Sequence, residues 1–363
     1  MMSEQLCLLA DIGGTNVRLA VSSVAEVRSD QAGVCFLSDA DKPSTRARTY
    51  QWVDHDSLED VITHYFADFG LDASQFSGVV LAVAGPVLPG QEVFHFTNVL
   101  RPIEVAKIRE LVETDQVFLI NDFAAQALAV SVVETQRPDL LVELIAGNGT
   151  GEGVKSVVGA GTGLGVAAWF PGGSHPLLGG HHPLVIPGEG GNASIGFKVP
   201  SVRNLALPLA QAIELYHQVH DSADRSVTPR NEDILSGKGL TQTYAALCLR
   251  DGDHAQFPSA KEISQLGQAG NDPRATETWQ IFYDCLAQVC SDCALQYLTT
   301  GGVFIAGGII PKNLELLDKE RFTAHFRNTW HYQDLLAKVS VHLVMAETSG
   351  LAGAAVYAGS VLK

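Results

Sequence analysis

The chain has 363 residues, of which 46% are hydrophobic and 18% are charged, a composition typical of a folded protein with a large core. The formal net charge is −16 and no dense Lys/Arg cluster is present, which argues against a nucleic-acid partner. No run of about 18 apolar residues predicts a membrane span, and the N-terminus lacks the basic segment of a signal peptide.

The first expected element is a β-hairpin over residues 6–23, LCLLADIGGTNVRLAVSS, with its turn at Gly13-Gly14. Such a turn has two interpretations. It can be a plain tight turn, or its backbone N–H groups can bind phosphate, with the Thr15 hydroxyl as a further donor. Asp11, at the end of the first strand, can hold Mg²⁺ through water while the metal bridges phosphates. These residues alone leave both interpretations open.

Two buried strands are expected next, at 78–87 and within 116–130, with a short amphipathic helix at 104–113 between them. The second strand ends at Asn121-Asp122 and passes into a helix. A carboxylate at this position is suited to accept a hydroxyl proton during phosphoryl transfer. It is equally suited to cap the helix, and either Asn121 or Asp122 can do both.

A second hairpin with the same plan is expected over 156–170, SVVGAGTGLGVAAWF. Its turn alternates glycines around a threonine, at Gly161, Thr162 and Gly163, which is costly in chain entropy for a turn without a function. Two such hairpins suggest a duplicated architecture. If their Gly/Thr turns face each other, they can bind one phosphate chain from both sides. The strand–turn–strand pattern differs from the strand-to-helix turn of a dinucleotide-binding fold.

Residues 171–196, rich in Gly, His and Pro, are expected to form a long loop. Within it, PGEGGN (187–192) places Glu189 and Asn192 where they can chelate vicinal sugar hydroxyls, although a solvated turn is an equal alternative. The histidines of this loop have poor spacing for zinc: His175, His181 and His182.

Helical periodicity returns at 202–218, 239–250 and 276–298, and a closing helix is expected at 350–362. Strands are expected at 301–311 and 339–346. The first of these enters a Gly307-Gly308 turn, which offers either a bare surface for a flat base or a close crossing of two elements. The six cysteines are scattered, which favours reduced thiols and a cytoplasmic protein, and for Cys290-x-x-Cys293 packing is favoured over a metal.

Taken together, these motifs resemble the bacterial glucokinases of the hexokinase type, in the actin-like ATPase superfamily. The matching stretches occur in family order: ADIGGTNVRLA, FTN (96–98), INDFAA, GAGTGLGVA, PGEGG, ILSG (234–237) and GGVFIAGGIIP. The resemblance implies an α/β, two-lobed actin-like (ribonuclease H-like) fold with a central cleft. It also implies a small domain of residues 1–122 plus the helix 350–363, and a large domain of residues 123–349.

The resemblance further implies ATP-dependent phosphorylation of glucose to glucose 6-phosphate, with Mg²⁺ and in a homodimer. Asp122 matches the catalytic base, and Asp11 the residue that holds Mg²⁺ through water. The implied sugar-binding residues are Asn98, Asn121, Asp122, Glu189, Asn192 and Glu232. The implied nucleotide-binding residues are Asp11, Gly13, Gly14, Thr15, Asn16, Gly161, Thr162, Gly163, Gly307 and Gly308.

Two departures lie on the sugar side. The family usually has His where this chain has Asn192, and it usually has a Trp in the segment that here reads VLRPIE (99–104). A kinase for another hexose or an amino sugar is therefore the near alternative. A sugar sensor without catalysis is a further alternative, against which the intact Asp122 and both hairpins argue. The C-x-C-G-x-x-G-C zinc pattern of the related sugar kinases and repressors is absent, and no room remains for an N-terminal helix-turn-helix.

Overall fold

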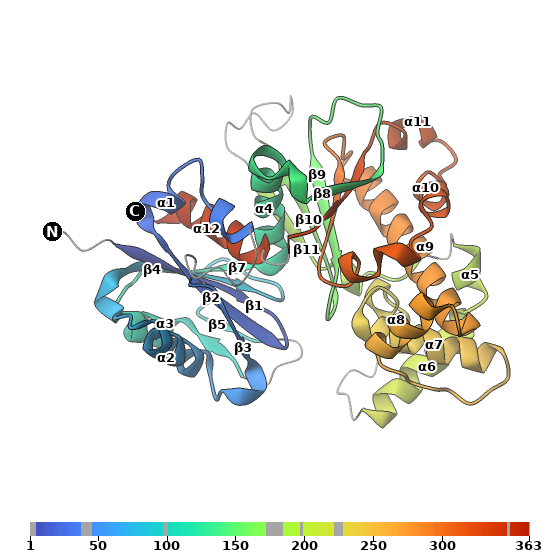
Figure 1. The fold of residues 1–363 in the computed structure, drawn as a ribbon, viewed down its shortest axis with the longest axis horizontal. Coiled ribbons are helices and arrows are strands. Elements are labelled where there is room, and N and C mark those ends of the chain that lie inside the picture. Colours follow the sequence, from blue (N-terminus) through green and yellow to red (C-terminus); the bar gives the residue numbers. More distant parts are fainter. Residues whose placement is uncertain are drawn as a thin grey trace. The chain divides into compact units, whose positions relative to one another are not determined.

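The computed structural model describes residues 5–37, 46–96, 101–171, 184–196, 199–220, 228–346 and 349–362. Its contacts divide the chain into two compact units. The first comprises residues 1–141, 185–188 and 344–363, and the second comprises residues 142–184 and 189–343. Each unit is built on one large mixed sheet with helices packed on it (Figure 1). Within the described ranges, no helix combines the length and apolarity needed to cross a membrane.

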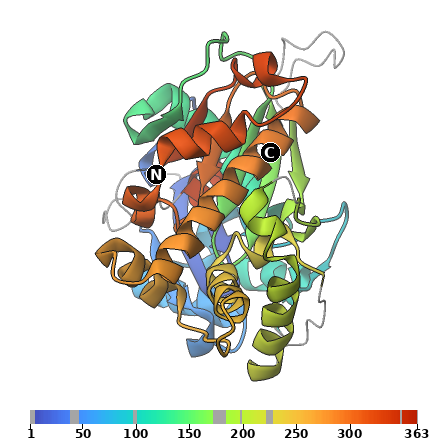
Figure 2. The same ribbon diagram turned by 90° about the vertical axis from the view of Figure 1, so that its right-hand side faces the viewer.

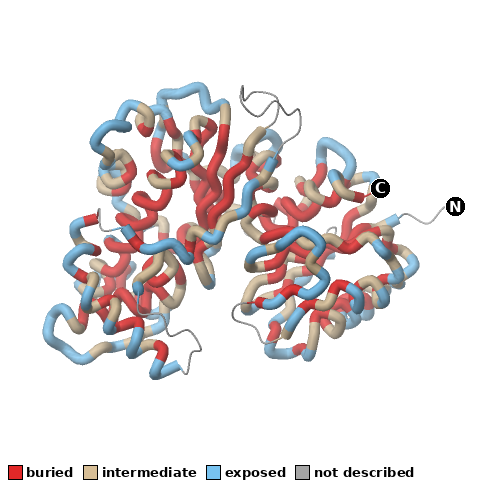
Figure 3. The backbone as a smooth tube through the Cα atoms, turned by 180° about the vertical axis from the view of Figure 1, so that it is seen from behind, coloured by how far each residue is buried: buried red, intermediate tan, exposed pale blue. Residues whose placement is uncertain are grey.

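The first unit has a five-stranded sheet in the order β3-β2-β1-β4-β7. Its strands are β1 (Leu6–Ile12), β2 (Asn16–Ser23), β3 (Arg48–Gln51), β4 (Phe76–Val83) and β7 (Val117–Asn121). Strand β1 is antiparallel to β2 and parallel to β4, and β4 is parallel to β7. The central strands are buried on both faces, which explains their almost unbroken apolar sequences (Figure 3). The predicted hairpin at 6–23 is confirmed.

Helices cover this sheet, and two of them pack tightly against each other. They are α1 (Val24–Val27), α2 (Leu58–Phe69), α3 (Val105–Val112), α4 (Asp122–Gln136) and α12 (Ser349–Val361), and a small ribbon is formed by β5 (Val93–Phe94) and β6 (Ile103–Glu104). A Cβ atom added to Gly353 of α12 would lie 1.7 Å from the carbonyl oxygen of Ala125 in α4. Small residues in the predicted closing helix therefore allow α12 to reach α4.

The second unit has a six-stranded sheet in the order β11-β10-β9-β12-β13-β8. Its strands are β8 (Leu141–Ile145), β9 (Lys155–Ala160), β10 (Leu164–Phe170), β11 (Leu184–Gly188), β12 (Val303–Ala306) and β13 (Val341–Val344). The division by contacts counts residues 185–188 of the edge strand β11 with the first unit. Strand β9 is antiparallel to β10 and parallel to β12, which is parallel to β13. A hairpin followed by two parallel strands thus occurs in both units, as the expected duplication requires.

The helices of the second unit include the long α9, which is the orange helix in Figure 2. They are α5 (Pro200–Arg203), α6 (Ala206–Val219), α7 (Gly237–Arg250), α8 (Ala260–Ala269), α9 (Pro273–Gln296), α10 (Lys319–Phe326) and α11 (Gln333–Leu336). Cys290 and Cys293 are buried in α9. Burial raises the pKa of Cys293 to about 12, so this thiol packs as an apolar group and is a poor metal ligand.

Several expectations differ from the structure. The loop expected over 171–196 contains β11 and a 3₁₀ turn at Gly190–Asn192. The helix expected at 202–218 is two helices with a break at 204–205. The domain boundary expected at residue 122 would separate α4 from the first unit, whereas the contacts of α4 with α12 place it there. His175, His181 and His182 lie outside the described residues.

Candidate active site

In the first unit, the ends of three parallel strands bring two of the predicted motifs to one edge of the sheet. Ile12 of β1 lies opposite Val83 of β4, which lies opposite Asn121 of β7. The N–H of Ala84 donates to the carbonyl oxygen of Ile12 at 3.0 Å, so the strands stay paired up to this edge. The glycine turn after β1 and the Asn121-Asp122 pair after β7 therefore share one edge, where ligands of such sheets bind.

The glycine turn of the first hairpin is held from outside by side chains of the β3 segment. Within the turn, the N–H of Gly13 donates to the carbonyl oxygen of Asn16 at 2.9 Å. The indole Nε1–H of Trp52 donates to the carbonyl oxygen of Gly13 at 2.8 Å, and the Gln51 amide donates to Asn16 Oδ1 at 2.5 Å. The turn has a fixed shape, and Thr15 at its tip is exposed.

Asp11 is placed beside this turn and already has a cationic partner. Its Oδ2 accepts from Arg18 Nη1 at 3.1 Å, across the antiparallel pair that joins the two residues. A Cβ atom on Gly350, in the first turn of α12, would lie 2.7 Å from Asp11 Oδ2. Burial raises the pKa of Asp11, and the neighbouring charge of Arg18 opposes that effect.

The sequence left open whether Asn121 or Asp122 caps the helix, and in the structure the cap of α4 is Asn121. The Oδ1 atom of Asn121 accepts from the N–H of Ala124 at 2.9 Å, which caps α4. Its Nδ2 donates to the carbonyl oxygen of Gly85 at 3.0 Å and to Asp122 Oδ1 at 3.1 Å. Asp122 Oδ1 also accepts from the N–H of Phe123 at 2.9 Å, so two donors fix the orientation of this carboxylate.

In the second unit, the corresponding edge carries the second glycine turn and the Gly307-Gly308 turn. The N–H of Gly161 donates to the carbonyl oxygen of Gly163 at 2.8 Å. Gly307 has a φ of +93°, and a Cβ atom on it would lie 2.5 Å from the carbonyl oxygen of Ala160. Gly308 and Gly161 have open space at the Cβ position. Gly307 is thus required by close packing, whereas Gly308 and Gly161 expose bare backbone.

The PGEGGN segment begins at the end of β11 and ends in the 3₁₀ turn Gly190–Asn192, which packs against β10. A Cβ atom on Gly191 would lie 2.3 Å from the carbonyl oxygen of Leu164, so this glycine allows a close approach of two backbones. The Asn231 side chain donates to the carbonyl oxygen of Gly190 at 3.0 Å, and the N–H of Asn231 donates to Ala193. These bonds join the PGEGGN segment to the 3₁₀ turn Asn231–Asp233, which carries Glu232.

Glu189 and Glu232 consequently influence each other, although the sequence separates them widely. Burial raises the pKa of Glu189, and the negative charge of Glu232 adds to this effect. Glu232 itself is paired with a cation, since its Oε1 lies 3.2 Å from Lys238 Nζ. Its Oε2 lies 3.0 Å from the Cβ position of Gly163, so the carboxylate borders the second glycine turn.

Two further charged residues near this pair were not predicted. Asp233 is fully buried and accepts from Arg230 at its Nε, at 3.0 Å, and at its Nη2, at 3.1 Å. Arg230 also donates through Nη1 to Asn192 Oδ1 at 3.2 Å. The sequence signal for this group was only the charge-rich run RNED, which reads equally well as a solvated turn.

The comparisons with known proteins show the family of the chain. The family model for glucokinase matches residues 8–361. The chain belongs to the glucokinase family. It is therefore an enzyme of the kinase class, which transfers a phosphoryl group to a sugar. A glucokinase of Pseudomonas aeruginosa strain PAO1 is 33% identical over 352 residues, covering 97% of this chain and 94% of its own. A glucokinase-like protein of Xylella fastidiosa strain Temecula1 is 31% identical, covering 96% and 93%.

Among solved structures, the glucokinase of an Antarctic psychrotroph has a TM-score of 0.71 and 26% identity, over 98% of this chain and 99% of that chain. The glucokinase of Balamuthia mandrillaris, solved in complex with glucose, has a TM-score of 0.74 and 20% identity, over 98% and 94%. The second likeness shows the fold alone.

The structure places the expected residues of this glucokinase-family chain in two sets, one in each unit. The first unit brings Asp11, the turn 13–16 and Asp122 to one edge, and the second unit brings the turn 161–163 close to Glu232. Asn98 lies outside the described residues. Asn121 lies at the end of β7 beside Asp122, and its amide caps α4 and holds Gly85 and Asp122.

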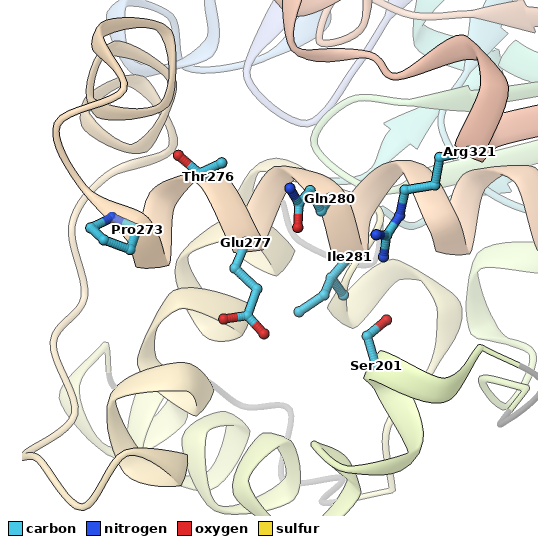
Figure 4. Close-up of a pocket in the computed structure, with 7 residues that line it drawn as sticks. All are labelled: Ser201, Pro273, Thr276, Glu277, Gln280, Ile281 and Arg321. Atoms are coloured by element: carbon cyan, nitrogen blue, oxygen red, sulfur yellow. The ribbon is translucent and has the colours of Figure 1, made fainter.

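A cavity of about 340 Å³ lies elsewhere in the second unit, along one side of α9 (Figure 4). It is lined by Ser201, Pro273, Thr276, Glu277, Gln280, Ile281 and Arg321. Its two charged side chains have partners within the protein, since Arg321 binds Asp284 through two nitrogens and Glu277 binds Arg250. None of the expected site residues that the structure describes lines this cavity, and we do not assign it to the reaction.

Proposed function

We propose that the chain transfers the γ-phosphoryl group of ATP to the 6-hydroxyl of glucose, with Asp122 as the general base. The observation that carries this proposal is the shared sheet edge in the first unit, where Asp122 and the glycine turn 13–16 lie at the ends of neighbouring parallel strands. A base and a phosphate-binding turn on one rigid edge are the two parts that such a transfer needs. The names of the relatives support glucose as the acceptor.

In the proposed reaction, Asp122 accepts the proton of the sugar hydroxyl as the oxygen attacks the γ-phosphorus in line. The carboxylate is in the first turn of α4, where the helix dipole favours its ionised form. Hydrogen bonds from the Asn121 amide and the Phe123 N–H to Oδ1 hold the carboxylate in one orientation. Less conformational entropy is therefore lost when the transition state forms.

For the sugar, we propose that Glu189 and Glu232 accept hydrogen bonds from neighbouring hydroxyls. Asn192 is proposed to donate to the anomeric oxygen, because its Oδ1 accepts from Arg230 and leaves the NH₂ group as donor. Asn98 and Asn121 complete the proposed sugar-binding set, with Asn121 acting mainly by positioning Asp122.

For the nucleotide, we propose that the turns 13–16 and 161–163 bind the phosphates through their N–H groups and the Thr15 and Thr162 hydroxyls. Gly307 and Gly308 are proposed to border the base. Mg²⁺ fits this set, because Asp11 offers a carboxylate beside the phosphate turn and Mg²⁺ commonly takes one or two carboxylates plus substrate phosphates. Arg18 already neutralises Asp11, which favours contact through water. The ion would neutralise charge on the transferred phosphoryl group.

The test is a coupled assay of ADP release with a panel of sugars, applied to the wild type and to Asp122→Asn. The variant should retain sugar binding and lose about 100-fold or more in kcat. The matched control is Asp115→Asn, an exposed aspartate of the same unit, which should leave kcat unchanged. Near-normal kcat in a folded Asp122→Asn variant would refute the role of Asp122. Sugar binding without ADP release in the wild type would instead support the sensor alternative.

The same panel decides between glucose and the second candidate, another hexose or an amino sugar. That candidate is favoured by the hydrogen bond from Arg230 to Asn192 Oδ1. This bond leaves only the NH₂ group of Asn192, a hydrogen-bond donor, available beside the proposed anomeric position. A higher kcat/KM for a sugar other than glucose would establish it.

Three further expectations are part of the proposal. A homodimer is tested by light scattering of the purified protein, which should give twice the chain mass. Membership of the actin-like ATPase superfamily is supported by the strand order repeated in the two units. A cytoplasmic location is tested by cell fractionation.

A further inference from the structure

Two histidines and an aspartate form a cluster in the first unit, at the start of α2, that the proposed reaction does not use. His55 precedes the helix, and Asp60 and His64 lie one turn apart on it. One nitrogen or oxygen atom from each of the three residues lies within 4.8 Å of the other two. The cluster is separate in sequence from all residues assigned above to sugar or nucleotide.

The distances within the cluster are close to those of a metal-ligand set. His55 Nδ1 lies 3.1 Å from Asp60 Oδ2, and His64 Nδ1 lies 3.1 Å from Asp60 Oδ1. Around a tetrahedral zinc ion with bonds of about 2.0–2.1 Å, ligand atoms are separated by roughly 3.3 Å. The two imidazoles are in edge contact, with ring centroids 4.9 Å apart at 72°. Small rotations of these side chains are enough to direct all three groups at one point.

Within the cluster, the His55 side chain is buried, whereas His64 and Asp60 are accessible to solvent. The His55 side chain is 9% exposed and packs against the edge of Tyr50. The N–H of Asp56 donates to Asp60 Oδ2 at 3.3 Å, which orients the carboxylate. His64 is 58% exposed and Asp60 is 35% exposed, so an ion and a water ligand can reach the cluster from solvent.

We propose that His55, Asp60 and His64 bind a divalent transition-metal ion of the type that imidazole prefers, with Zn²⁺ as the representative. Two neutral imidazoles and one carboxylate are a ligand set for such ions, and water completes the coordination. Without metal, Nδ1–H of His55 donates to the Asp60 carboxylate, and Nδ1–H of His64 donates to the same carboxylate and to the carbonyl oxygen of Asp60 at 2.9 Å. On binding, the ion takes the place of these hydrogen bonds at Nδ1, and each neutral ring carries its proton on Nε2. The residues of the site are joined to the first glycine turn by Trp52, whose carbonyl oxygen accepts from the N–H of His55.

The experiment is calorimetric titration of the metal-stripped protein with Zn²⁺. We expect about one ion per chain. His64→Gln is the first variant, because its exposed side chain can be replaced without disturbing the fold, and Asp60→Asn is the second. Each should weaken binding at least about tenfold. His254→Gln, an exposed histidine of the second unit, is the matched control and should bind as the wild type does.

The absorption spectrum of the Co²⁺-loaded protein gives an independent signature of the ligands. A spectrum without a thiolate charge-transfer band, which changes in His64→Gln and in Asp60→Asn, supports the proposal. Unchanged Zn²⁺ affinity in both variants, a thiolate band, or no binding by the wild type would overturn it. None of these measurements depends on sugar-kinase activity, so the proposal and the proposed function fail separately.

Discussion

The two glycine turns occupy the same place in the two sheets, yet the protein holds them in different ways. Each follows the strand that is antiparallel to its hairpin partner and parallel to the next strand, and each places a threonine at an exposed tip. The first turn is held by side chains, chiefly the Trp52 indole bonded to the carbonyl oxygen of Gly13. The second is held by backbone, since Gly237 at the start of α7 donates to the carbonyl oxygen of Gly161 at 3.0 Å.

This difference changes what the glycines do. In the second unit, Gly307 at the end of β12 approaches the end of β9 so closely that no side chain fits between them. In the first unit, a Cβ atom on Gly13 would meet only the carbonyl oxygen of Asn16, at an ordinary 3.7 Å. A repeated strand order therefore fixes where the glycine turn lies, and the neighbouring elements decide which residues hold it.

The largest effect that this comparison predicts is on stability, in Gly307→Ala. The residue has a φ of +93°, which costs an L-residue about 1–3 kcal/mol, and its Cβ would press on the Ala160 carbonyl. The free energy of unfolding, measured with urea, should fall by at least that amount. Gly13→Ala, in the first glycine turn, is the comparison variant and should leave the unfolding free energy nearly unchanged, because its Cβ would make only an ordinary contact. It should weaken the nucleotide binding that we propose for this turn. Equal stability of the two variants would contradict the packing role assigned to Gly307.

The next effect concerns Glu232, a carboxylate that borders the second glycine turn at Gly163. Among the described residues, no carboxylate lies against Gly13 of the first turn in the same way. We propose that Glu189 accepts hydrogen bonds from sugar hydroxyls, and its ionised carboxylate accepts them more strongly than the neutral acid does. The kcat/KM for glucose should therefore fall as the pH drops through the raised pKa of Glu189. Glu232→Gln removes one of the two causes of that raised pKa, the other being burial. The acid limb of the profile should therefore move to lower pH.

The maximum kcat/KM for glucose should also fall in Glu232→Gln, by about tenfold, because the charged hydrogen-bond acceptor is replaced by a neutral one. The pH at which kcat/KM declines is the informative reading, since a lost contact alone would leave it in place. Glu214→Gln, an exposed glutamate on α6, serves as the control. An acid limb at the same pH in Glu232→Gln and in the wild type would show that the two carboxylates act independently.

A smaller effect is expected from Trp52→Phe, which removes the donor that holds the first turn. The ring still packs against Phe96, so the loss is that of one hydrogen bond, about 0.5–1.5 kcal/mol. We expect KM for ATP to rise a few-fold. Trp279→Phe makes the same change at a buried Trp of the second unit whose Nε1 has no hydrogen-bond partner among the described residues, and it should leave KM for ATP unchanged. A similar KM for ATP in both variants would show that Trp52 does not hold the turn.

The sequence was sufficient for the parts of the fold that depend on local pattern. Both hairpins, the strand and helix that meet at Asn121-Asp122, and the closing helix have periodicity and turn residues that are visible in a single chain. Helices α1, α2, α8, α10 and α11 and strands β3, β5, β6, β8 and β11 were not predicted. Strand β11 contains Pro187 and Gly188, which weaken any strand pattern and are tolerated because β11 is an edge strand.

The site could be predicted only as far as its residues belong to motifs. Asp233 is fully buried and paired with Arg230, but in the sequence it is one charge among several in RNED. The capping by Asn121 rather than Asp122 depends on the dihedral angles at the start of α4, which a sequence does not reveal. The hydrogen bonds that fix each glycine turn come from segments far away in the chain, Trp52 for the first and Gly237 for the second. The pattern of glycines alone therefore could not distinguish the two turns.

An effect of the same size as that of Trp52→Phe is expected at Asn192, where this chain departs from the usual histidine of the family. Arg230 donates to its Oδ1 at 3.2 Å, which fixes the amide so that its NH₂ group is the donor available to a sugar oxygen. Asn192→Asp keeps the contact with Arg230 and removes the donor, whereas Asn192→His restores a longer group that can donate. One hydrogen bond between neutral groups corresponds to about 0.5–1.5 kcal/mol, or roughly a few-fold to tenfold in affinity.

We therefore expect kcat/KM for glucose to fall in Asn192→Asp and to rise in Asn192→His. Both changes should be smaller with 1-deoxyglucose, because that sugar lacks the anomeric hydroxyl that Asn192 is proposed to bind. Comparing the two sugars separates recognition of this hydroxyl from any general change in the PGEGGN segment, which would affect both sugars alike. Equal changes with the two sugars would mean that Asn192 does not contact the anomeric position, and the determinants of sugar specificity would then have to be sought in residues 99–104.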